Sequence, residues 1–305
     1  MRLTNEQIAE FRREGVLIAG RVLTDKDLQP VIKDISAWID RRARTLKAEG
    51  ALHDLCEDEP FERRLVHLST QCPTISDGMD IMHMRCPALY TFLHNGHLLD
   101  AVESLIGPEI TCNPIQHLRA KIPKATVSKM NQGLGKNVPW HQDAAVTWEE
   151  ADPVEIITCW IPLVNATAAT GCMQVLPGVF RQAYLQHQAQ GATQIMPQLM
   201  PDVPPRVAAC AKGSIVFMNK YTPHRSTDNV SDVIRWSLDL RYQPTGRPTG
   251  RPFHPAFVVR SQSNPDSAHL HFEDWCHQWE MALKKAKGYK AHRTVPPAQR
   301  GPTSA

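Results

Sequence analysis

The sequence predicts a fold made mainly of β-strands, with helices at its two ends. Apolar residues recur at helical spacing through residues 1–107, change to the short runs and alternations of strands through residues 108–260, and then return to helical spacing. Gly- and Pro-containing turns separate the central runs. The 305 residues suit a single domain, in which residues 261–305 form a C-terminal helix and tail.

The composition excludes several classes of function. The net charge is only +3 and the basic residues are scattered, so nucleic acid is not an expected partner. No apolar run approaches the roughly 18 residues of a membrane helix, and the polar first residues do not resemble a signal peptide, so we expect a cytoplasmic protein. The eight cysteines form no Cys-x-x-Cys pair, which argues against a disulfide framework. We expect a small molecule as the partner, and the sequence leaves a homodimer open.

The N-terminal part begins with two capped helices. Thr4 and Gln7 form a capping-box pattern before an apolar stripe, and Gly15 is typical of a helix end. A short strand is expected at residues 16–19. Thr24 then precedes a second helix, which carries acidic residues in its first turn.

Residues 50–85 are rich in charge and interrupted by Pro and Gly, which indicates a long loop with short helices near a pocket mouth. Two more helices are expected between residues 87 and 106, followed by strands between 110 and 122. Three residues alternate on the last of these strands: His117, Arg119 and Lys121. If their shared face looks inward, His117 lines the cosubstrate or substrate pocket; an exposed edge strand explains the alternation equally well.

One short segment and one distant histidine carry the chemistry of the chain. His141 and Asp143 lie two residues apart, so on an extended backbone both side chains point to the same face. With His224 they offer two imidazoles and one carboxylate, a donor set that leaves three positions of an octahedral Fe(II) open. A closed shell of strong ligands would instead indicate structural zinc.

Arg235 follows His224 by eleven residues, within a predicted strand. Its planar guanidinium suits a carboxylate, because it can donate two parallel charge-assisted hydrogen bonds. A 2-oxo acid with a second carboxylate could therefore chelate the iron at one end and bind Arg235 at the other. The pattern predicts Fe(II), a dicarboxylate cosubstrate and O₂ as the oxidant.

The order of these motifs resembles the phytanoyl-CoA dioxygenase (PhyH) branch of the Fe(II)/2-oxoglutarate-dependent oxygenases. The start of the chain, with its helix, glycine and second helix, is also similar to that family. The motifs that carry the resemblance are His141-Gln142-Asp143, Cys159-Trp160-Ile161-Pro162, Gly171-Cys172-Met173-Gln174-Val175-Leu176-Pro177-Gly178, Gly213-Ser214-Ile215-Val216-Phe217, and the stretch from His224-Arg225-Ser226 to Arg235.

The resemblance implies a double-stranded β-helix (jelly-roll, cupin-like) core over residues 108–260. It implies that His141, Asp143 and His224 bind Fe(II) and that Arg235 binds 2-oxoglutarate. With a carboxylate at position 143, where a halide would otherwise bind, hydroxylation is expected rather than halogenation.

Four further residues are candidates for the cosubstrate site. Ser226 and Trp160 match residues that line this site in the family. Ser237 lies two positions past the cosubstrate arginine, hence on the same strand face, as in related oxygenase families. His117 joins them if its strand face looks inward. The chain departs from the family at Val179-Phe180, where Ser-His is usual, so contacts made by that pair are not expected here.

Segments outside the core are expected to shape the pocket. Residues 123–139 precede the metal ligands and suit a lid, and the polar insertion at residues 185–205 suits the pocket entrance. Trp275 and Trp279 indicate a C-terminal helix that packs its aromatic side on the barrel. The tail after Lys290 is expected to be disordered.

We therefore expect an oxygenase that hydroxylates an unactivated C–H bond of a small metabolite or natural-product intermediate, with release of succinate and CO₂. The same ligands allow desaturation, epoxidation or rearrangement. The alternatives are an acyl-CoA hydroxylase of the same family, a non-catalytic ligand-binding member of the fold, and a zinc hydrolase. The sequence shows no basic cluster for a CoA diphosphate, which favours a smaller substrate.

Overall fold

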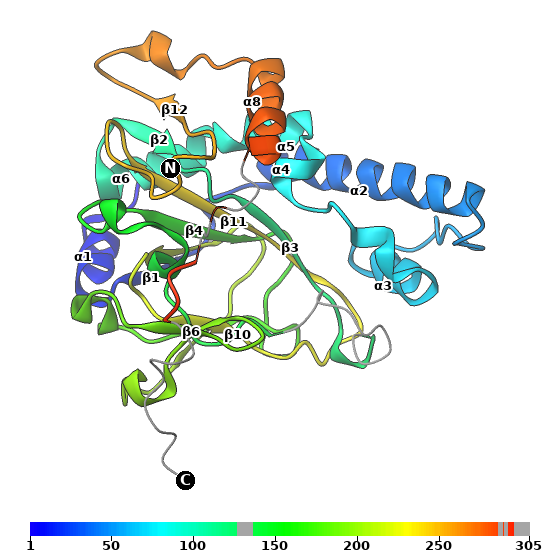
Figure 1. Cartoon of the computed structure of the whole chain (residues 1–305), viewed down its shortest axis with the longest axis horizontal. Coiled ribbons are helices and arrows are strands. Elements are labelled where there is room, and N and C mark those ends of the chain that lie inside the picture. Colours follow the sequence, from blue (N-terminus) through cyan, green and yellow to red (C-terminus); the bar gives the residue numbers. More distant parts are fainter. Residues whose placement is uncertain (127–136, 286–288, 290–291, 296–305) are drawn as a thin grey trace.

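A computed structural model describes residues 1–126, 137–285, 289 and 292–295. Figure 1 shows most of the helices gathered around one side of a large β-sheet, with a smaller β layer on the other side. The helices are α1 (Asn5–Glu14), α2 (Asp25–Ala48), α3 (Phe61–Gln71), α4 (Ile81–Met84), α5 (Pro87–Leu93), α6 (Gly96–Ile106) and α8 (Phe272–Lys285). None of them, within these described ranges, combines the length and hydropathy that a bilayer span requires.

The predicted helix caps are confirmed. Thr4 and Gln7 form the capping box of α1, which ends at Gly15 in the left-handed conformation. Thr24 caps α2 in the same way through Asp27. Each box satisfies backbone N–H groups that the first turn of a helix leaves without partners.

Seven strands form the large sheet, and all of their pairings are antiparallel. The order is β1-β9-β4-β11-β2-β12, and β3 also pairs with β11. The strands are β1 (Val16–Ala19), β2 (Ile110–Cys112), β3 (His117–Lys121), β4 (Ile157–Pro162), β9 (Ile215–Asn219), β11 (Arg235–Pro244) and β12 (Phe257–Arg260). The short strand expected at residues 16–19 is thus an edge of this sheet.

The smaller layer consists of a three-stranded sheet and a hairpin. The sheet has the order β10-β5-β8, and β6 pairs with β7 in the hairpin. The strands are β5 (Met173–Val175), β6 (His187–Ala189), β7 (Thr193–Ile195), β8 (Arg206–Ala208) and β10 (His224–Ser226). Trp160 and Val216 of the large sheet pack with Met173 and Val175 of the small one in a single apolar cluster. Two sheets facing each other in this way confirm the predicted double-stranded β-helix core with flanking helices.

The two faces of β11 have different roles. Trp236, Leu238, Leu240 and Tyr242 join the core that the helices cover. The alternate positions of the strand carry polar side chains towards the smaller sheet: Arg235, Ser237, Asp239 and Arg241. Most of this strand is buried because both of its faces are covered. A covered polar face of this kind has to serve a site or be paired internally.

Two segments are more regular than predicted. Residues 50–85, expected to be mainly loop, contain the 11-residue helix α3, whose Leu65 and Leu68 are buried. The insertion at residues 185–205 contains the β6–β7 hairpin and the short helix η5 (Pro197–Leu199). In both segments the regular element buries apolar side chains: Leu65 and Leu68 in α3, and Ile195 in β7. The Pro and Gly residues that suggested loops lie outside these short elements.

The C-terminal helix is confirmed as α8, with Trp275 and Trp279 buried. The ring centroid of Trp275 lies 5.2 Å from that of Tyr90 in α5, so the helix packs at least partly on other helices. The prediction of a disordered tail is wrong for residues 292–295, because Val295 N–H donates to the carbonyl of His187 in β6 over 2.9 Å. The remaining predicted tail and most of the predicted lid at 123–139 lie outside the described residues.

Candidate active site

The two predicted histidine ligands are joined through their backbones. The N–H of His141 donates to the carbonyl of His224 over 3.1 Å, and the N–H of His224 donates back over 2.9 Å. Because β10 is held by β5, this bridge fixes His141 to the smaller sheet. Gln142 is extended (φ −111°, ψ 141°), so Asp143 points to the same side as His141 even though the short helix η2 (Asp143–Val146) begins there.

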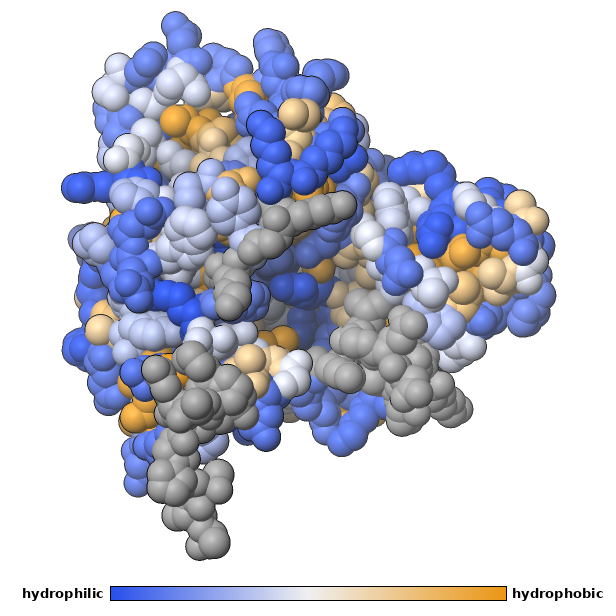
Figure 2. All heavy atoms as spheres, viewed as in Figure 1, coloured by the Kyte–Doolittle hydropathy of each residue, from blue (hydrophilic) through white to orange (hydrophobic). Residues whose placement is uncertain are grey.

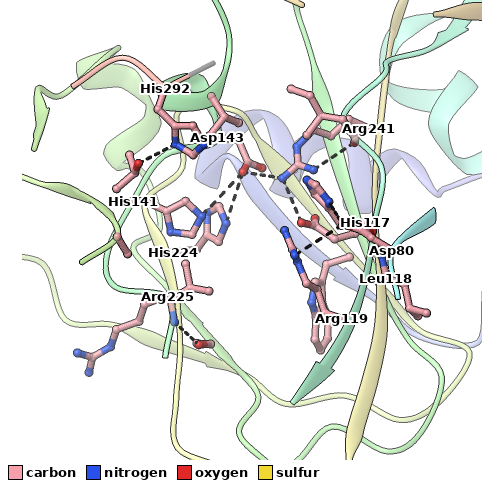
Figure 3. Close-up of a pocket in the computed structure, with 18 of the residues that line it drawn as sticks. Asp80, His117, Leu118, Arg119, His141, Asp143, His224, Arg225, Arg241 and His292 are labelled. Atoms are coloured by element: carbon pink, nitrogen blue, oxygen red, sulfur yellow. Dashed lines mark hydrogen bonds and ion pairs between the residues drawn. The ribbon is translucent and has the colours of Figure 1, made fainter. Parts of the chain in front are cut away.

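Three ligand atoms converge at this point. Nε2 of His141 lies 3.9 Å, and Nε2 of His224 lies 3.8 Å, from Oδ1 of Asp143. Figure 3 shows both rings directed at this carboxylate. Within the described part of the chain, this is the one group of three or more His, Cys, Asp or Glu side chains whose ligand atoms are close enough to share a metal ion. The structure therefore brings together the three residues that the sequence predicts as ligands.

Hydrogen bonds prepare both imidazoles for a metal. Nδ1 of His141 donates to the carbonyl of Pro139 over 2.9 Å, and Nδ1 of His224 donates to the carbonyl of Thr222 over 3.0 Å. A carbonyl can only accept, so each Nε2 keeps its lone pair on the side of Asp143. Burial and the neighbouring His224 lower the pKa of His141 to about 3, which keeps its ring neutral. This donor set fits a divalent transition metal such as iron.

Two residues outside the predicted set hold Asp143. Nη2 of Arg241 donates to Oδ1 over 2.7 Å, and the Thr158 hydroxyl donates to Oδ2. Burial opposes a charge on Asp143, but the guanidinium of Arg241 outweighs it and keeps the pKa of Asp143 well below its usual range. The sequence contains a signal for Arg241, because it lies an even number of positions after Arg235 and hence on the same strand face.

Arg235 is buried and is held by neutral groups. Nη1 donates to the hydroxyl of Ser237 over 2.7 Å, and Nε approaches the carbonyl of Gly171 at 3.3 Å. The guanidinium carbon lies 5.0 Å from the ring centroid of Trp160. Gly171 has φ +78°, and a Cβ at this position would lie 2.8 Å from the carbonyl oxygen of Thr227, so only glycine fits. Three predicted cosubstrate residues therefore form one group: Arg235, Ser237 and Trp160.

Lys121 adds a second cation that the sequence-based prediction missed. It is the register partner of Arg235 across β3 and β11, and its Nζ donates to the hydroxyl of Ser226 over 3.3 Å. The same hydroxyl accepts from the N–H of Val138 over 2.8 Å. Burial and the nearby Arg235 lower the pKa of Lys121 to about 8. Two positive groups and the predicted Ser226 thus lie at one end of the polar face.

His117 lies away from this group. It pairs with Asp239 across β3 and β11, whereas Lys121 at the opposite end of β3 pairs with Arg235. Nδ1 of His117 is 2.7 Å from Oδ2 of Asp80. His117 lines the same cavity, and Figure 3 shows it beside Arg241.

The metal ligands and both arginines of β11 line one cavity of about 1050 Å³. Figure 2 shows a hollow near the middle of this face, with hydrophilic atoms inside it. Its basic lining residues are Arg119, Lys121, Arg225, Arg235, Arg241 and Arg251. No basic cluster is visible in the sequence because these side chains come from β3, β10, β11 and the loop after β11. Thr193 of the 185–205 insertion also lines the cavity, as predicted for a segment near the entrance.

Comparison with known families gives a match that covers most of the chain. Residues 11–237 match the phytanoyl-CoA dioxygenase (PhyH) family. The chain belongs to the phytanoyl-CoA dioxygenase family. Membership makes it a non-haem iron oxygenase that uses 2-oxoglutarate and O₂, in agreement with the expected cofactors. At the family's departure point, neither Val179 nor Phe180 is among the described residues that line the cavity; Phe180 packs against Gly15.

Comparison with solved structures supports the phytanoyl-CoA dioxygenase fold. The apo structure of the non-heme monooxygenase ThoJ has a TM-score of 0.64 at 17% identity, covering 92% of this chain and 97% of its own. The epimerase SnoN, in complex with Fe3+, alpha ketoglutarate and nogalamycin RO, has a TM-score of 0.54 at 17% identity, covering 80% and 86%. The carbocyclase SnoK from nogalamycin biosynthesis has a TM-score of 0.51 at 16% identity, covering 88% and 91%. A comparison with curated protein sequences found no match.

Proposed function

We propose that His141, Asp143 and His224 hold Fe(II) and that Arg235 binds the distal carboxylate of 2-oxoglutarate. The observation that carries this proposal is the contrast in partners within one cavity. The three metal-type ligands lie within 4.8 Å of one another, while Arg235 is buried without a carboxylate partner among the described residues. A buried cation without an anion is costly, so a dicarboxylate that reaches from the metal to Arg235 is favoured.

Each neighbouring residue has a defined task in this scheme. Ser237 and the Gly171 carbonyl orient the guanidinium, and the Trp160 ring covers its face. Lys121 and Ser226 supply a second charge and a hydroxyl for the same carboxylate. Charge-assisted hydrogen bonds are strong in such a buried setting, because little water competes for them.

The reaction we propose is hydroxylation of an unactivated C–H bond. When bound, the iron with 2-oxoglutarate and O₂ supplies the oxidising power; one oxygen atom enters the substrate and the other enters succinate, with loss of CO₂. The protein orients the reactants and excludes water from the cavity. Arg241 and Thr158 keep Asp143 ionised and pointed at the metal position.

We propose a small metabolite or natural-product intermediate as the substrate. A cavity of about 1050 Å³ is at the upper end of the range for small-molecule sites, and it has to accept 2-oxoglutarate as well. SnoN and SnoK, two of the similar structures, are named for steps in nogalamycin biosynthesis, which is compatible with this size class. The cavity contains both polar and apolar side chains, so the substrate is expected to have both kinds of surface.

The deciding experiment is an anaerobic titration of Fe(II)-loaded protein with 2-oxoglutarate. A weak visible charge-transfer band is expected for the wild type, and for the Arg235→Gln variant the band should require about 100-fold more 2-oxoglutarate. A wild type that holds iron but gives no band would contradict the proposal. Succinate formation with a substrate panel separates an oxygenase from a binding protein, and 2-oxoglutarate binding separates it from a zinc hydrolase.

A further inference from the structure

Arg251, like Arg235, has no acidic partner among the described residues, and it lies in another part of the cavity. Nε of Arg251 donates to the carbonyl of Val146 over 2.7 Å, which ties the guanidinium to the end of η2. Among the described residues, no carboxylate lies within ion-pair distance of its two terminal nitrogens. Residues 127–136, 286–288, 290–291 and 296–305 contain no Asp or Glu, so the sequence holds no further acidic side chain for it.

The acids that line the cavity already have partners. Asp80 accepts from His117 and lies 4.0 Å from Arg119. Asp143 and Asp239 both pair with Arg241. The half-buried Arg251 therefore presents an uncompensated positive charge to the cavity, as Arg235 does on β11.

The backbone holds Arg251 in this place. Gly250 has φ +71°, and a Cβ there would lie 2.5 Å from Cβ of Thr147, so the loop approaches the segment after Asp143 more closely than other residues allow. Trp148 N–H donates to the Gly250 carbonyl over 2.9 Å. Arg251 is thus fixed to the segment that carries a metal ligand, and it is not a mobile surface side chain.

Apart from Arg241, which is paired with Asp143 and Asp239, the titratable groups closest to Arg251 in the cavity are neutral imidazoles. His254 and His292 line the same part of the cavity; burial, and then the charge of Arg251, lower the pKa of each, that of His254 to about 4. Both rings are therefore uncharged near neutral pH and can donate or accept hydrogen bonds. Apolar residues complete the lining of the cavity: Met79, Met82, Ile115, Leu118 and Val146.

We propose that the substrate carries a single carboxylate and an apolar body, and that Arg251 binds the carboxylate. This inference rests on the proposed function, in which Arg235 is occupied by 2-oxoglutarate. One guanidinium with neutral imidazoles beside it balances one negative charge, and its free edge can donate two parallel hydrogen bonds to a carboxylate. A phosphate dianion would require a second uncommitted cation. The nearby Arg119 and Arg241 already face Asp80, Asp143 and Asp239, and Arg225 donates to Gln174 and stacks on the ring of Trp140.

The test uses the full chain loaded with Fe(II) and saturated with 2-oxoglutarate under argon. The probes are hydrophobic monocarboxylic acids of about 6 to 12 carbon atoms, each compared with its primary amide and its alkyl phosphate, a size range that the cavity accepts. Binding is measured by calorimetry and ligand-observed NMR. For the best acid we expect at least about tenfold tighter binding than for its amide, the effect of a hydrogen bond to a charged group.

Three variants assign this preference to one side chain. Arg251→Gln should reduce the preference for acid over amide to less than about threefold, and Arg251→Lys should leave an intermediate preference because it keeps the charge without the planar fork. Arg247→Gln, in the same loop but exposed, should keep the full preference. Thermal unfolding and 2-oxoglutarate binding establish that each variant is folded.

Several outcomes would overturn the inference. They are equal binding of acid and amide, no acid binding up to about 10 mM, tighter binding of the phosphate, or a preference that survives in Arg251→Gln. Failure of the proposed function looks different: 2-oxoglutarate then does not bind the wild type, whatever the acids do. An acid that only replaces absent 2-oxoglutarate at Arg235 would still bind Arg251→Gln, so the two failures are distinguishable.

Discussion

The two ends of the polar face of β11 carry the same residue type in opposite circumstances. Arg241 lies between Asp143 and Asp239, at 2.7 and 3.2 Å. Arg235, six positions earlier on the same face, is equally buried but contacts only neutral groups. Burial opposes both charges; the two carboxylates outweigh it and raise the pKa of Arg241, whereas the pKa of Arg235 falls to about 10. One arginine is therefore part of the protein's own framework, and the other is prepared for a ligand.

The largest effect is expected at the Arg241 end. Arg241→Gln leaves the buried Asp143 and the partly exposed Asp239 without their cation, which should lower the free energy of unfolding by about 3–5 kcal/mol. Fe(II) binding should also weaken by about 10–100-fold, because Asp143 loses the group that orients it. Chemical denaturation and metal titration measure the two effects. If the variant is as stable as the wild type, Arg241 is not the structural arginine, and the contrast with Arg235 fails.

Arg235→Gln should give the complementary result. The dissociation constant of 2-oxoglutarate should rise by about 100-fold, since two charge-assisted hydrogen bonds are lost. The free energy of unfolding should change by less than about 1 kcal/mol, because no buried anion is left unpaired. Calorimetry under argon and denaturation check both numbers. Strong destabilisation with unchanged 2-oxoglutarate binding would reverse the assignment of the two ends.

Thr158→Val removes a single hydrogen bond to Asp143 and leaves its ion pair with Arg241 intact. Valine keeps the shape of threonine but removes the hydroxyl that donates to Oδ2 of Asp143. Affinity for Fe(II) should fall by about tenfold, while 2-oxoglutarate affinity at saturating metal stays within about twofold. Competition with a coloured chelator measures the first value. An unchanged metal affinity would show that Arg241 alone orients the carboxylate.

The smallest effect is expected from Lys121 at the Arg235 end. Its pKa of about 8 means that the side chain loses its proton as the pH rises through that value. Burial and, after it, the charge of Arg235 lower this pKa, whereas the charge of Asp228 raises it. Affinity for 2-oxoglutarate should therefore be highest below pH 8 and fall by up to about tenfold above it. The same titration with Lys121→Met should be flat, and a wild-type curve without slope would exclude Lys121 from the cosubstrate site.

The sequence predicts the parts of the site that local geometry determines. The extended backbone at Gln142 makes His141 and Asp143 share a side, and the strand period makes Ser237 accompany Arg235. The partners of Asp143 were missed because Thr158 and Arg241 reach it from other strands. The even spacing from Arg235 places Arg241 on the strand face that lines the cavity. It does not show that Arg241, and not Arg235, forms the ion pair with Asp143.

The difference between local patterns and contacts of distant segments also explains which fold predictions were correct. Caps at Thr4 and Thr24 are local patterns, and they were predicted correctly. The strand β4 is buried along its whole length, so it shows little polar–apolar alternation and had to be inferred from its apolar, β-branched composition. The docking of residues 292–295 depends on β6, which lies about 100 residues away in the chain, so no pattern within the tail predicts it.

The paired backbone hydrogen bonds between His141 and His224 have a practical consequence for handling the protein. The sheet, rather than the ion, holds the two imidazoles side by side. A chelator should therefore strip the iron without unfolding the chain, and ferrous salt added afterwards should restore turnover with no renaturation step. Because the ligands are in place before any metal binds, nickel leached from an affinity resin can also occupy the site. Freshly purified protein is therefore best treated with a chelator and reloaded with Fe(II) before its activity is measured.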